Sequence, residues 1–173
     1  MSRFRIPNSA TIHNARSFIQ GNSPFEAPFG EAVLEFHPKW VHVEPVALAM
    51  AAAWGAWARR KGMSIRVENG RQANYAARMK LFECLGISHL TSFTAHEEAG
   101  RFLPLTQVSK TSQVSAVIGN ISALLHLNDD PESLSAVQYC VSELLRNVIE
   151  HSGSQARRQV LMALPTTPGQ GSS

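Results

Sequence analysis

In the first half of the chain, short stretches with the residue types of β-strands alternate with longer stretches whose composition favours helices. Residues 31–36 (EAVLEF) and 63–68 (MSIRVE) are short runs of β-favouring residues, which predicts two strands. Between them, residues 45–61 begin with an alanine-rich apolar run and end on three basic residues. Glu44 precedes this segment and Gly62 follows it. Acidic residues at the start, basic residues at the end and a terminal glycine are typical of a helix that complements its own dipole. We therefore expect a buried helix at residues 45–61.

A second amphipathic helix is predicted at residues 74–85, where hydrophobic residues recur at helical spacing before Gly86. A short strand or arm is expected near the N-terminus. Strands that alternate with helices in this way usually pair in parallel, because the helix carries the chain back across the sheet. The pattern therefore predicts an α/β fold.

The second half of the chain is dominated by two helical patterns. The first covers residues 109–127. The second is predicted from Pro131 to about His151, with Asp130 as its N-cap and proline at the first helical position. The hydrophobic stripe expected along this second helix is Leu134, Val137, Val141, Leu145 and Val148.

Short strands are predicted on either side of these two helices, at residues 101–105 and 158–164. We expect residues 1–105 to form one α/β half. Residues 106–173 are assigned to a second part with two helices and a flexible tail.

Composition narrows the classes of protein to which the chain can belong. Of its 173 residues, 44% are hydrophobic and 17% are charged, which is sufficient for a folded core. The formal charge of +3 is small and spread out, which argues against nucleic-acid binding. The longest apolar run, residues 45–58, is too short to cross a bilayer as a helix, so no membrane association is expected.

Two features of the sequence favour a cytoplasmic protein. Two cysteines are too few for a disulfide scaffold or a four-cysteine zinc site, and they suit a reducing compartment. The N-terminal stretch MSRFRIPNSATIHNAR also lacks the apolar centre of a signal peptide.

Three polar residues of the predicted 131–151 helix carry the candidate chemistry. Glu143, Asn147 and His151 are spaced four and four, so they lie one above another on a helix. They begin on the face away from the hydrophobic stripe and end beside it. One interpretation is a surface helix with ordinary polar residues. Asparagine is nevertheless a poor mid-helix residue, because its amide competes with the backbone, and this favours a functional role.

The string ELLRNVIEHS, residues 143–152, resembles the N-box of the GHKL (Bergerat-fold) ATPase family. This family includes the catalytic domains of histidine kinases and the anti-sigma-factor kinases. The resemblance covers residues 134–152, and residues 109–127 look like the first helix of that domain. It implies an ATP-binding regulatory or signalling protein that uses Mg-ATP for hydrolysis or for Ser/Thr phosphotransfer.

The resemblance also implies a role for each of the three polar residues. Glu143 matches the glutamate that acts as a base in ATPase members, since a carboxylate can accept a proton from water or a hydroxyl. Asn147 matches the asparagine whose amide oxygen is a ligand of Mg²⁺. His151 matches a position near the phosphates. For His151, a purely structural role as a charge near the C-terminus of the helix remains open.

The chain departs from the family pattern after residue 150. Relatives carry a later aspartate that binds adenine, followed by glycine-rich boxes around the phosphates. Here no Asp or Glu follows Glu150, and the only late Gly-x-Gly lies at residues 169–171. We therefore expect a C-terminally truncated, frameshifted or fragmentary member with impaired ATP binding. Whether it is an enzyme stays open.

The first half of the chain resembles the STAS-like half that precedes GHKL domains in some bacterial regulators, over residues 30–90. This implies a protein partner. The serine that such relatives phosphorylate has no counterpart between His42 and Leu48. The alternative function is a non-catalytic protein–protein interaction module without nucleotide. In that case the two helices and a strand at residues 159–164 would present their surface to a partner.

Overall fold

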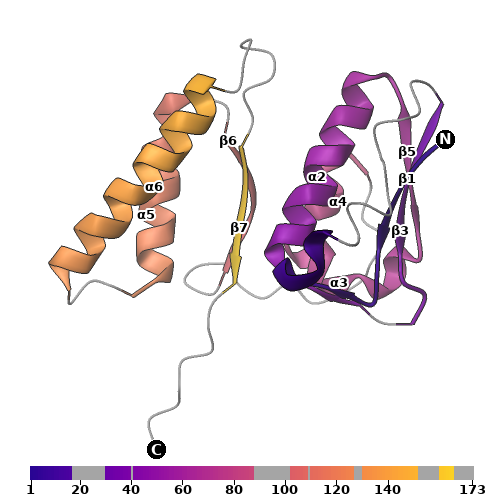
Figure 1. Cartoon of the computed structure of the whole chain (residues 1–173), viewed down its shortest axis with the longest axis horizontal. Helices are drawn as coiled ribbons and strands as arrows, with labels where there is room; N and C mark the ends of the chain where they lie inside the picture. Colours follow the sequence, from indigo (N-terminus) through magenta and orange to yellow (C-terminus); the bar gives the residue numbers. More distant parts are fainter. Residues whose placement is uncertain are drawn as a thin grey trace, which may run out of the picture. The chain divides into compact units, whose positions relative to one another are not determined.

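The computed structural model describes residues 1–16, 30–39, 41–87, 102–108, 110–126, 130–151 and 160–165. Within these ranges the chain is a mixed α/β structure with small sheets and α-helices, which confirms the predicted class (Figure 1). The chain divides into two compact units, residues 1–95 and residues 96–173. We describe each unit separately.

The first unit is built on a three-stranded parallel sheet. Its strands are β1 (Ser2–Ile6), β3 (Glu31–Phe36) and β5 (Ser64–Glu68), in the order β1-β3-β5. The predicted strands at residues 31–36 and 63–68 are β3 and β5, and their expected parallel pairing is confirmed. A short parallel pair, β2 (Ser9–Ala10) with β4 (His42–Val43), extends the β1–β3 pairing.

Helix α2 (Pro45–Arg60) lies along one face of this sheet (Figure 1). The helix ends as its sequence predicts, because Gly62 adopts a φ of +71°, which is strained for any other residue. The N–H of Met63 then donates to the carbonyl of Ala58 at 3.1 Å, which satisfies a carbonyl of the last turn.

The sheet and α2 share a hydrophobic core. Phe4 and Leu34 project from neighbouring positions of β1 and β3, and both are buried. The ring of Phe4 lies 5.6 Å from that of Trp54 on α2. The indole N–H of Trp54 donates to the hydroxyl of Ser2 at 3.2 Å, so its polar atom is satisfied inside the core.

The prediction of a single helix at residues 74–85 is wrong in one respect. The structure has two short helices, α3 (Asn74–Arg78) and α4 (Leu81–Cys84), separated where Lys80 adopts a left-handed φ of +59°. In one unbroken helix, Met79 and Leu81 would point in directions about 160° apart. The break allows both side chains to be fully buried.

Short 3-10 turns complete the described structure of both units. They span Ile12–Asn14, Gly70–Gln72 and Thr111–Gln113.

The second unit pairs β6 (Phe102–Val108) with β7 (Val160–Pro165) in an antiparallel ribbon. The helices α5 (Val114–Leu124) and α6 (Pro131–His151) lie side by side against one face of it (Figure 1). Both predicted strands and both predicted helices are therefore present. The expected boundary between residues 105 and 106 falls inside β6, and all of β6 belongs to the second unit.

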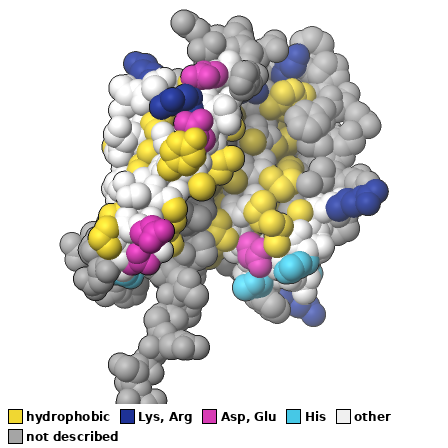
Figure 2. Space-filling model, turned by 60° about the vertical axis from the view of Figure 1, so that its left-hand side comes forward, with side chains coloured by type: hydrophobic (Ala, Val, Ile, Leu, Met, Phe, Trp, Pro, Cys, Tyr) yellow, Lys and Arg dark blue, Asp and Glu magenta, His cyan; other side chains and the backbone are white. Residues whose placement is uncertain are grey.

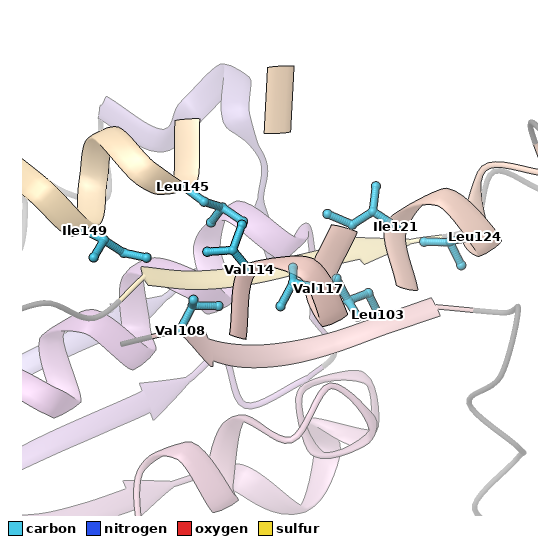
Figure 3. Packing of buried hydrophobic residues seen from close by; sticks show 8 residues of the cluster. All are labelled: Leu103, Val108, Val114, Val117, Ile121, Leu124, Leu145 and Ile149. Atoms are coloured by element: carbon cyan, nitrogen blue, oxygen red, sulfur yellow. The ribbon is translucent and has the colours of Figure 1, made fainter. Parts of the chain in front are cut away.

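The core of this unit joins the two helices to β6. Figure 3 shows Leu145 of α6 beside Val114 of α5, with Val108 of β6 below them. The buried members of this core are Leu103, Val108, Val114, Val117, Ile121, Leu124, Leu145 and Ile149. Among the described residues, α6 contributes one face to this core, through Leu145 and Ile149.

Candidate functional site

Helix α6 positions all three polar residues predicted to carry the chemistry. Its start is fixed locally, because the carboxylate of Asp130 accepts the N–H of Ser133 at 3.1 Å. A hydrogen bond from the Ser133 side chain, followed by this backbone bond, lowers the pKa of Asp130. Pro131 follows as the first helical residue. The predicted N-cap is thereby confirmed, and it satisfies a backbone N–H of the first turn.

The buried row on α6 differs from the predicted stripe at Val148, and Leu134 is half-buried but is not part of this core. Leu145 and Ile149 are buried, and Val137 and Val141 are partly buried against the same core. Val148, which the pattern assigned to the core, is 43% exposed. A row of residues four apart is inclined to the helix axis. The packing against α5 follows this row, so it selects Ile149 in place of its neighbour.

Glu143 and Asn147 lie on the side of α6 opposite this buried row. Each is two residues from Leu145, and two residues turn a helix through about 200°. Asn147 is exposed, and the side chain of Glu143 keeps 40% of its accessible surface. One helical turn separates the two residues, so the structure brings them together on one accessible face.

The third predicted residue, His151, is the last residue of α6. Its backbone continues the series begun by Glu143 and Asn147. Its side chain lies outside what the structure describes, so the prediction that it lies near phosphates stays a prediction.

Arg146 is the charged neighbour of this face. Its Nη1 lies 3.7 Å from Oε1 of Glu143, an ion pair between residues three apart. The pair is exposed and long, so it contributes little to stability. The guanidinium nevertheless supplies positive charge next to the Glu143 carboxylate.

Exposed hydrophobic side chains occur on the same helix, and the sequence pattern did not reveal them. Leu144 is 66% exposed and Tyr139 is 69% exposed. Figure 2 shows acidic and hydrophobic side chains next to one another on the surface of the second unit. The signal that could have identified Leu144 is its position next to Leu145, since adjacent residues cannot share one narrow face of a helix.

Few residues on this face of α6 could supply oxygen ligands to a metal ion. Within the described ranges, no group of three or more His, Cys, Asp or Glu side chains is placed to hold a metal ion. The side chain of Asn147 makes no hydrogen bond to the part of the chain that the structure describes, and the residue is exposed, so its amide oxygen is accessible to a cation. A cation bound there would need most of its ligands from a bound molecule or water.

Comparisons with known proteins give no further assignment. No family model, no curated protein and no solved structure matches this chain. A separate finding concerns membranes: no helix among the described residues combines the length and the apolar character needed to span one.

Proposed function

We propose that the second unit is the N-box part of a histidine-kinase-like ATPase domain and binds Mg-nucleotide through the outer face of α6. The observation that carries this proposal is the placement of Glu143 and Asn147. They lie one turn apart, on the accessible side of a helix whose other side is anchored in the core. A ligand can therefore reach both side chains without disturbing the fold.

The chemistry of the two side chains suits this ligand. The amide oxygen of Asn147 is a hard donor of the kind that Mg²⁺ prefers, and the nucleotide phosphates would supply further oxygens. The carboxylate of Glu143 can accept a proton from an attacking water or hydroxyl. His151, one turn further along, would lie on the phosphate side of the site.

The first unit fits the regulatory half of such a protein. We propose that it is STAS-like and binds a protein partner. The parallel order β1-β3-β5, with α2 along one face, supports this proposal. The family pattern places an adenine-binding aspartate and glycine boxes after the N-box. Because this sequence has no such residues after Glu150, we expect weak binding.

Thermal unfolding with and without Mg-ATP tests the nucleotide proposal. A ligand present at 100 times its Kd stabilises the native state by about 2.7 kcal/mol, because it binds only the folded chain. For a chain of this size that corresponds to a rise in Tm of roughly 5 °C or more. We expect millimolar Mg-ATP to raise the Tm, and Asn147→Ala or removal of Mg²⁺ to abolish the rise.

Glu132→Gln is the matched control for this experiment. Glu132 is an exposed acidic residue in the first turn of the same helix, far along the axis from Asn147. The control should keep the full rise in Tm. Equal rises in the control and in Asn147→Ala would place any bound nucleotide elsewhere on the chain.

A specific observation favours a second candidate, a non-catalytic protein interaction module. Leu144 and Val148 on α6 are exposed, and exposed hydrophobic residues near one another often mark a protein contact. A folded chain whose Tm does not respond to millimolar Mg-ATP would favour this second candidate over nucleotide binding.

A further inference from the structure

The sheet of the first unit carries a row of ion pairs on the face opposite α2. Along each strand, side chains alternate between the two faces, so every second residue belongs to this outer face. The charged residues on it are Arg3 and Arg5 of β1, Glu31 and Glu35 of β3, and Arg66 and Glu68 of β5. We call these six side chains the ion-pair ladder.

The ladder links all three strands. Nη1 of Arg3 lies 2.6 Å from a carboxylate oxygen of Glu35 and 2.7 Å from one of Glu68. Arg5 adds a second contact to Glu35, at 3.0 Å. Arg66 contacts Glu68 at 2.7 Å and Glu31 at 2.8 Å. Arg3 thus ties β1 to β5, although β3 lies between these two strands in the described sheet.

A hydrophobic residue lies within the ladder. Val33 lies on the same face as the charged residues, between Arg3 and Arg66 in the strand register. It is nevertheless fully buried. The described helices of this unit lie on the other face of the sheet (Figure 1). The aliphatic stems of paired arginines can shield such a side chain from water.

Protonation changes the charge of the ladder sharply. At neutral pH its three arginines and three glutamates cancel. Hydrogen bonds from Arg3 lower the pKa of Glu35 and that of Glu68 below the ordinary value. Protonation of the glutamates in acid therefore leaves the positive charges of three arginines near one another without their partners' negative charge. In the sequence, Met1 precedes β1 and His37 follows β3; Nδ1 of His37 accepts the N–H of Lys39 at 3.3 Å.

We propose that the ion-pair ladder is an acid-released latch that holds β1 on the sheet. Strand β1 is the strand expected to leave, because it lies at one edge of the described sheet and carries two of the three arginines, whereas β5 at the other edge carries one. A carboxylate with a lowered pKa in the folded state stabilises that state above its unfolded pKa. This contribution is lost as the pH falls through the folded pKa. The latch is therefore closed near neutral pH and opens in acid.

Hydrogen exchange of the full chain, followed by mass spectrometry from pH 7 to pH 3 and corrected for intrinsic rates, tests the latch. We expect the protection of β1 to fall about fivefold or more as the ladder is protonated, while α2 keeps its protection. A loss of protection in β1 and α2 together would overturn the proposal, because it would mean that acid unfolds the unit as a whole.

A double variant tests the same point at constant pH. Glu35→Gln with Glu68→Gln removes both carboxylates that Arg3 contacts, so β1 should exchange faster at pH 7 and lose its pH dependence. Glu132→Gln, in the second unit, is the control and should behave as the native chain. Unchanged protection of β1 in the double variant would overturn the latch. The pH series on the native chain decides the proposal if the double variant does not fold.

Discussion

At the scale of single residues, Gly55 of α2 packs closely against the side chain of Leu85. Gly55 is buried, and a Cβ added there would overlap Cδ2 of Leu85. Leu85 is only 2% exposed, so it cannot move aside freely. We expect Gly55→Ala to lower the free energy of unfolding by about 1–3 kcal/mol. Urea unfolding followed by tryptophan fluorescence measures this, because all three tryptophans lie in the first unit.

Gly119 in α5 provides a comparison, because here the change to alanine is expected to raise stability. Apart from its own helix backbone and its two chain neighbours, no described heavy atom lies within 4 Å of a Cβ added at this exposed position. Gly119→Ala should stabilise the second unit by up to about 1 kcal/mol, because alanine is the better helix former. Combining Gly55→Ala with Leu85→Ala should cost less than the sum of the two single changes, because the added Cβ fills part of the space that the Leu85 side chain leaves. A Gly55→Ala variant as stable as the native chain would contradict the close packing of α2.

At the scale of the element, α6 shows how two adjacent leucines take opposite roles. Leu145 is 3% exposed and packs in the core, whereas Leu144 is 66% exposed. Leu145→Ala should lower the free energy of unfolding of the second unit by about 2–5 kcal/mol. Leu144→Ala removes the same atoms from a solvated position, so it should change stability by less than about 0.5 kcal/mol. Thermal unfolding monitored by far-UV circular dichroism checks both; comparable losses would mean that α6 is rotated about its axis.

At the scale of the whole molecule, the division into two units has a measurable consequence. Each unit has a hydrophobic core of its own, and the tryptophans report only on the first. We expect Leu145→Ala to lower the unfolding midpoint measured by circular dichroism while the midpoint measured by tryptophan fluorescence moves less. Equal shifts by the two probes would show that the chain unfolds as a single cooperative unit.

Local signals in the sequence predicted the elements well and the contacts between them poorly. Residues 31–36 form the predicted strand, and Asp130 with Pro131 starts the predicted helix, because these features depend on neighbouring residues. The break at Lys80 was missed because it depends on the burial of Met79 and Leu81 by other elements. The same holds for Ile149, which α5 selects over Val148.

The sequence by itself determined the α/β class, the order of the elements and the four-residue spacing of Glu143, Asn147 and His151. These features follow from hydrophobic period, capping residues and helix geometry, all of which act over a few residues. Only the tertiary structure decided that Glu143 and Asn147 lie opposite the buried row of α6, and that six charges from three strands form one ladder. Those placements depend on packing angle and strand register, which are set by contacts between residues distant in the chain.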